Sequence, residues 1–124
     1  MAHSSLIFTI AHPWDRSRRA EVNLTLGTRA TLSWVPREVV ERLELPRLPR
    51  RRFLLRDGST IERETAAAIV ELSGNFVGAS VVVAESGDRH HLGMTTLESL
   101  GLAFNPAGAR LVPKPLLAMS GQQL

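Results

Sequence analysis

Apolar and polar residues alternate most regularly between residues 20 and 26. Seven residues alternate between the two faces: Ala20, Val22, Leu24 and Leu26 on one, and Glu21, Asn23 and Thr25 on the other. A period of two is typical of a strand that buries one face, so we predict a half-buried strand over these residues.

This strand leads into a small polar turn and then a short helix. Gly27 ends the alternation, and residues 27–31 are too small and polar to form a core. Pro36 has no N–H to lose and a backbone φ suited to a helix, so we predict a helix over residues 37–43. Such a turn exposes backbone and short side chains, which makes it the first candidate for a functional site.

The other apolar stretches predict further strands separated by turns. A basic connection, WDRSRR, follows the first strand, and Asp57-Gly58 is a strong hairpin signal. Pro46 and Pro49 interrupt residues 46–52, which we therefore predict as a loop. Strands are expected over residues 4–10, 53–56, 59–72, 76–84, 102–105 and 110–112, with another ending at Leu92.

A second short helix is predicted towards the C-terminus. Thr95 and Glu98 have the spacing of a capping box, and Gly101 ends the helix after little more than one turn. The whole pattern predicts an all-β fold with two short helices, closed or nearly closed into a barrel. A short internal repeat supports the barrel: Leu26-Gly27-Thr28 and Leu92-Gly93-Met94 each lead through a polar turn into a helix.

Length and composition favour one domain in a reducing compartment. The 124 residues suffice for one core, which we assign to residues 1–113, with residues 114–124 as a C-terminal tail. No apolar run is long enough to span a bilayer and no signal peptide is recognised, so a cytoplasmic location is expected. The absence of cysteine excludes disulfides, thiol catalysis and zinc sites built on thiolates.

Arginine dominates the basic residues and gathers in two clusters. Fourteen of the 15 basic residues are arginine, and the clusters lie at positions 16, 18 and 19 and at positions 47, 50, 51, 52 and 56. Such clusters can contact phosphates or an acidic partner. However, aromatic residues make up only 5% of the chain and none is interleaved in the basic runs of residues 16–19 and 47–52. Solvated strand edges are therefore the simpler explanation, and specific nucleic-acid binding is not expected.

Several segments together resemble the retropepsin-like aspartic proteases, in particular small bacterial aspartyl-protease-like proteins. The similar segments are HLGMTTLESLGL (residues 91–102), TLSWVPREVVERL (31–43), RRFLLRDGSTIERE (51–64) and ARLVP (109–113). These segments occur in the family's order, and the resemblance as a whole covers about residues 20–113. The resemblance implies a closed acid-protease barrel with one or two short helices, a flap hairpin, and a homodimer in which each subunit contributes half of a peptide-binding site.

The motif that carries the family's chemistry is altered in this chain. The family has Asp-Thr-Gly-Ala in the turn, whereas this chain has Gly27-Thr28-Arg29-Ala30. The mechanism needs two carboxylates close enough to share one proton, and glycine supplies none. The aspartates at positions 15, 57 and 88 are poor substitutes, since none follows an apolar strand with a Thr-Gly pair. We therefore expect no catalytic residue.

Arg29 has a further consequence if two turns meet at a dimer axis. The family's glycine permits close approach, whereas two arginines would bring unpaired cations together at a cost of several kcal/mol. Three arrangements avoid this cost: the two turns lie further apart, the guanidinium groups point to solvent, or an anionic group lies between the two arginines.

The candidate binding residues lie at two places in the chain. They are Gly27, Thr28, Arg29 and Ala30 in the turn, and Asp57 and Gly58 at a hairpin tip that is either an ordinary turn or a flap. No cofactor or metal is expected. His90 and His91 are adjacent and point to opposite faces of a strand, so they do not form a chelating pair, and we expect one buried and one exposed imidazole.

Three functional interpretations follow from the sequence. The first is a retropepsin-like domain without peptidase activity that binds a peptide or protein, or has a structural role, as a homodimer. The second is an active aspartic peptidase present in an altered form, with glycine in place of its aspartate. The third is a basic adaptor that binds nucleic acid or an acidic partner through its arginines.

Overall fold

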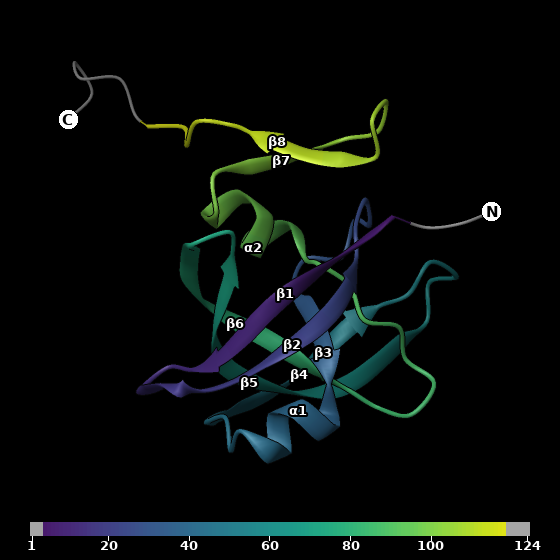
Figure 1. The fold of residues 1–124 in the computed structure, drawn as a ribbon. Helices are drawn as coiled ribbons and strands as arrows, with labels where there is room; N and C mark the ends of the chain where they lie inside the picture. The colour runs from purple at the N-terminus through teal and green to yellow at the C-terminus, as the bar shows by residue number, and fades with distance from the viewer. Residues whose placement is uncertain (1–3, 119–124) are drawn as a thin grey trace.

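The computed structural model of the protein describes residues 4–118 (Figure 1). The fold is predominantly β with two short helices, which confirms that part of the prediction. The elements in chain order are β1 (Ser5–His12), β2 (Asp15–Thr25), β3 (Ser33–Pro36), α1 (Arg37–Arg42), β4 (Arg47–Leu54), β5 (Thr60–Leu72), β6 (Asn75–Ala84), α2 (Met94–Ser99), β7 (Leu102–Asn105) and β8 (Arg110–Pro113).

Six strands form one sheet in the order β2-β1-β5-β6-β3, with β4 also paired to β5. β1 and β2 cover the two N-terminal stretches that were predicted as strands, and they form an antiparallel hairpin with Phe8 opposite Val22. β3 was not predicted, because its four residues, Ser33–Pro36, are too short to show a period. It runs parallel to β6, with Val35 opposite Val83.

Strand pairing does not close this sheet into a barrel within the described residues, since β2 and β3 end the order without pairing with each other. Residues 90–92 lie between them. The N–H of Thr25 donates to the C=O of His90 at 2.9 Å, and the N–H of Trp34 donates to the C=O of His91 at 2.9 Å. The predicted strand ending at Leu92 is therefore only an isolated bridge that connects the two edges.

The core confirms the alternation seen in the sequence. The predicted inner face of β2 is buried at Val22 and Leu24, while Glu21 and Asn23 are exposed. The run of valines in β6, within a predicted strand, is buried on both faces, which is typical of a continuous apolar stretch. Each large buried aliphatic or aromatic side chain contributes about 1.5–3 kcal/mol. The largest fully buried apolar side chains are Phe8, Ile10, Leu24, Val35, Val40, Val70, Val81, Val82 and Val83.

The arginine-rich segment that we predicted as a loop is part of β4. Its residues pair antiparallel with β5 from Arg47 opposite Ala66 to Leu54 opposite Thr60. Pro49 is tolerated because it lies where the register shifts, on a strand whose other edge has no partner among the described residues. The prediction was wrong because proline excludes a helix and a central strand, but not an edge strand.

Two other predictions are wrong in detail. β2 already begins at Asp15, so the connection from β1 shrinks to a turn at Pro13 and Trp14. α2 has Gly93 as its N-cap and no side-chain cap, so Thr95 does not form a capping box. The hydroxyl of Thr95 donates instead to the C=O of Thr31 at 2.9 Å.

β7 and β8 form a separate two-stranded antiparallel sheet beyond α2 (Figure 1). Lys114 follows it and donates its N–H to the C=O of Gly101 at 2.7 Å. Residues 114–118 are neither helix nor strand, and the rest of the predicted tail lies outside the described residues. Over residues 4–118, no helix has the length and apolar character needed to cross a membrane.

Candidate functional site

The candidate turn begins at Gly27, two residues after the last residue of β2. Gly27 has a φ of +77°, which glycine adopts without strain and other residues rarely adopt. A Cβ at this position would also lie 2.9 Å from the Phe104 ring of β7. Both features oppose a side chain at residue 27, so an aspartate there would require a strained backbone and movement of the Phe104 ring.

The turn is connected to the chain that precedes and begins α2. We call residues 27–33 the first turn segment and residues 92–96 the second turn segment. The hydroxyl of Thr28 lies 3.4 Å from the C=O of Leu92, and the N–H of Met94 donates to the C=O of Ala30 at 2.8 Å. The two similar Leu-Gly sequences of the chain thus lie side by side in the fold.

Gly93 permits the closest approach between these two segments. A Cβ on Gly93 would lie 2.1 Å from the carbonyl carbon of Leu32, a backbone atom that cannot rotate away. The N–H of Gly93 donates to the hydroxyl of Ser33 at 2.8 Å, and that hydroxyl donates to Thr96 at 2.9 Å. Ser33 and Thr96 are both buried, so these contacts fix the two segments to each other inside the protein.

A pocket of about 260 Å³ opens beside the turn, between the first turn segment, α2 and β7. Two cations, Arg29 and Lys114, line it together with a single carboxylate, that of Glu98. Arg29 is exposed, and no ion pair to it is present among residues 4–118. With only one carboxylate in its lining, this pocket cannot share a proton between two acids, and it is better suited to an anionic group.

Asp57 and Gly58 do not meet the turn. Asp57 accepts hydrogen bonds from the N–H and hydroxyl of Ser59 at 2.9 and 2.6 Å, which lower the pKa of its carboxyl group. A Cβ on Gly58 would find no atom within 4 Å. The tip is therefore an exposed turn, and the structure brings together only the first four of the six candidate residues.

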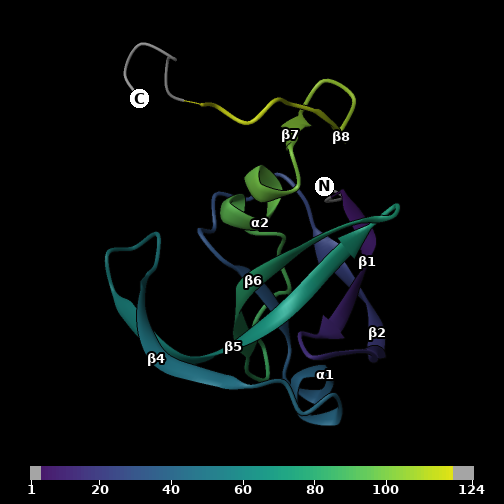
Figure 2. The same cartoon turned by 90° about the vertical axis from the view of Figure 1, so that its left-hand side faces the viewer.

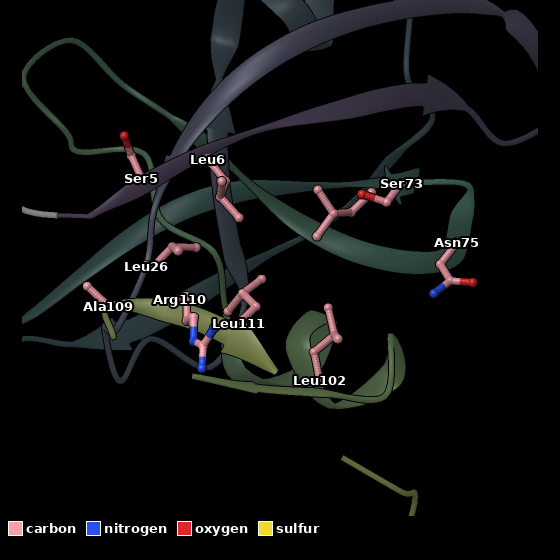
Figure 3. Close-up of a pocket in the computed structure, with 10 residues that line it drawn as sticks. Ser5, Leu6, Leu26, Ser73, Asn75, Leu102, Ala109, Arg110 and Leu111 are labelled. Carbon is pink, nitrogen blue, oxygen red and sulfur yellow. The ribbon is translucent and has the colours of Figure 1, made fainter. Parts of the chain in front are cut away.

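A larger pocket of about 390 Å³ lies between the β7–β8 hairpin and residues of β1 and β5 (Figure 3). Its wall is mainly leucine, and Arg110 of β8 lies among the leucines in the close-up. The leucines that line it are Leu6, Leu26, Leu72, Leu102 and Leu111. The hairpin therefore borders both this apolar pocket and the cationic pocket at the turn, and Leu102 lines both of them.

The two histidines do not divide into one buried and one exposed side chain, so that prediction is wrong. His90 and His91 are both half-buried. Burial lowers the pKa of His91, with smaller contributions from the positive charges of Arg89 and His90. The Nδ1 atom of His91 is buried and has no hydrogen-bond partner among the described residues, so the neutral imidazole is favoured.

A half-buried ion pair supports the loop that leads to these histidines. Arg63 of β5 donates to both carboxylate oxygens of Asp88, at 2.7 and 3.0 Å, and Asp88 also accepts the N–H of Glu85 at 2.8 Å. The hydrogen bond from Arg63 is the main cause of the lowered pKa of Asp88. Asp88, one of the aspartates considered as a substitute acid, therefore has a structural role.

Comparisons with family models, curated proteins and solved structures found no match to this chain. The site is thus interpreted from its geometry. Sequence reasoning identified the turn but missed Phe104, Gly93 and Ser33 as the residues that surround it. For Gly93, the repeated Leu-Gly pattern contained the necessary signal, whereas Phe104 comes from a separate hairpin and no local pattern relates it to Gly27.

Proposed function

We propose that the protein has a retropepsin-like fold without peptidase activity and acts as a binding or structural domain in a homodimer. Three features support the fold: the paired turn segments, a helix after each of them, and the β4–β5 hairpin with its Asp57-Gly58 tip. They occur in the chain in the order in which the family resemblance requires them.

One observation carries the proposed absence of peptidase activity. At residue 27, where the family has its aspartate, the backbone φ is positive and the Phe104 ring occupies the direction of a side chain. An aspartic peptidase needs a carboxylate from each turn at the centre of its site. Here each turn would contribute a glycine and an exposed Arg29.

The β7–β8 hairpin supports the homodimer. An isolated two-stranded sheet is only marginally stable in water, and this one has no third strand among residues 4–118. The segment after it exposes Leu116 and Leu117, the latter fully. Adjacent exposed leucines beside an unpaired sheet are typical of a surface that another chain covers.

The proposed inactivity is tested with a broad peptide library at acid to neutral pH, with and without pepstatin. Wild-type protein should cleave nothing, and pepstatin-sensitive cleavage would overturn the proposal. A second arm uses Gly27→Asp/Arg29→Gly, alone and with Phe104→Ala to clear the space for the carboxylate. If both variants are folded and neither cleaves any peptide, the interpretation as an altered active peptidase is wrong.

The oligomeric state is tested separately by sedimentation equilibrium. A homodimer should have a mass of about 27 kDa, twice the 13.6 kDa of one chain. Leu116→Asp/Leu117→Asp should shift the equilibrium towards the monomer if these leucines are covered. A wild-type monomer at high protein concentration would contradict the dimer without bearing on the peptidase result.

A further inference from the structure

The two arginine clusters differ in what their side chains contact. In β2, Arg16 and Arg19 both pair with the carboxylate of Glu71, at 2.9 and 3.1 Å. Arg18 pairs with Glu44 at 2.9 Å. Carboxylates of the same chain thus neutralise the cluster on β2.

The cluster on β4 is largely unpaired. Arg50 lies 3.4 Å from Glu62, but Arg51, Arg52 and Arg56 are exposed and have no carboxylate partner among residues 4–118. Residues 47–64 contain six arginines and three acidic residues, whereas the rest of the chain has nine basic and nine acidic residues. The whole formal charge of +3 therefore lies in residues 47–64, which comprise β4, the turn after it and the first part of β5.

The backbone of β4 is open on the side away from β5. β4 pairs only with β5 in the described sheet, and the hairpin curves away from the rest of the molecule (Figure 2). The N–H of Leu55 donates to the C=O of Ser59 at 2.8 Å. Because hydrogen-bonded pairs alternate along an antiparallel ladder, the N–H and C=O groups of Leu54 and Arg52 face outward.

The side chains at this edge favour a polypeptide over a nucleic acid. Phe53, the aromatic residue of β4, is held by an edge contact with Trp34 at 5.4 Å between ring centroids, so it does not offer a free face to a base. Leu54 is 75% exposed and offers an apolar contact instead. Strand addition uses such open backbone groups, with side chains on alternate positions giving specificity.

The same edge disfavours a second copy of this chain. Two β4 strands placed edge to edge would bring arginines opposite arginines, and like charges directly opposite destabilise a strand pair. Pro49 and the register shift beside it restrict pairing to the segment from Arg51 to Leu54. A partner strand must therefore be short and acidic.

We propose that the open edge of β4 binds an extended acidic segment of a partner protein, which adds as a strand beside residues 51–54. Its carboxylates pair with Arg51, Arg52 and Arg56, and an apolar residue contacts Leu54. This surface is separate from the turn at Gly27, so the proposal does not depend on the absence of peptidase activity.

The test uses an N-acetylated decapeptide that alternates glutamate with valine and threonine, titrated calorimetrically at low and high salt. We expect binding that weakens as salt rises, and slowed amide exchange at Arg52 and Leu54 but no change at Phe53. Arg51→Glu/Arg52→Glu should weaken binding about tenfold or more. The matched control Arg42→Glu/Arg110→Glu, which changes the net charge equally, should stay within about twofold.

Two further arms can overturn the proposal. A decapeptide that is N-methylated at alternate residues lacks the N–H groups that would donate to the outward C=O groups of β4. If it binds as tightly as the unmethylated decapeptide, strand addition is excluded. Tighter binding of a ten-nucleotide uridine RNA that depends on the same arginines would assign the edge to nucleic acid instead. Equal losses in the β4 variant and its matched control would show only non-specific charge attraction, and circular dichroism checks that both variants are folded.

Discussion

Gly27 and Gly93 occupy the same place in two Leu-Gly segments of similar sequence, yet different atoms surround them. The missing Cβ of Gly93 would meet the Leu32 backbone at 2.1 Å, whereas that of Gly27 would meet the Phe104 side chain at 2.9 Å. Gly27 has a positive φ, and Gly93 has an ordinary extended φ of −83°. Gly93 is thus needed for the fold itself, while Gly27 stands where the resemblance places a functional side chain.

The largest effect is expected for Gly93→Ala. The new methyl group can be accommodated only if the backbones of the two turn segments separate, which also breaks the buried hydrogen bonds of Ser33. We expect a loss of about 4 kcal/mol or more in the free energy of unfolding, or failure to fold. Urea denaturation of soluble protein measures this loss, and a value below about 1 kcal/mol would show that the segments are not in contact.

Gly27→Ala should have a smaller effect, of about 1–3 kcal/mol, because the obstacle is a side chain and the positive φ adds strain. Phe104→Ala removes the obstacle but not the strain. In a double-mutant cycle, the double variant should therefore lose less stability than the sum of the two single variants. Additive losses would mean that Phe104 does not cover residue 27.

Next in size is Ser33→Ala, which leaves the buried N–H of Gly93 and the hydroxyl of Thr96 without their partner. A loss of about 1–3 kcal/mol is expected. Thr28→Val is the matched control in the first turn segment, since its hydroxyl makes only long contacts of 3.4 and 3.5 Å at a half-buried site. Thr28→Val should lose less than about 0.5 kcal/mol, and an equal loss in both variants would contradict the special role of the buried hydrogen bonds that Ser33 makes to the second turn segment.

The smallest effect is a dependence of stability on pH through His91, which bridges β2 and β3. Its pKa is lowered in the folded protein, so the unfolded chain binds the proton more readily. Stability is therefore fully present above the ordinary histidine pKa of about 6.5 and falls as the pH drops through the folded value. Unfolding at pH 7.5 and 5.5 tests this, and His91→Gln should reduce the difference.

Local pattern was sufficient to predict much of this fold. The alternation over residues 20–26, the Asp57-Gly58 turn and the continuous valines of β6 all predicted elements that the structure confirms. These features depend on near neighbours in the chain. Pro49 misled the prediction of β4, because only the arrangement of strands in space shows that β4 lies at an edge.

The site was less predictable, because its contacts join distant parts of the chain. Residues 27–30 were identified as a site from their small side chains and the altered motif, but Phe104 covers residue 27 from 77 positions away. Likewise, the two arginine clusters look alike in sequence. Ion pairs with Glu71 of β5 and with Glu44 make the cluster on β2 different from the cluster on β4.

The position of the Phe104 ring against Gly27 is the most direct test of the account, since it closes the space for a carboxylate. The measurement is the nuclear Overhauser effect between the α protons of Gly27 and the ring protons of Phe104 in the wild-type protein. The structure predicts strong cross-peaks, because a Cβ at Gly27 would lie only 2.9 Å from the ring. Absent cross-peaks, with both residues assigned, would contradict the account and leave the turn open to a catalytic side chain.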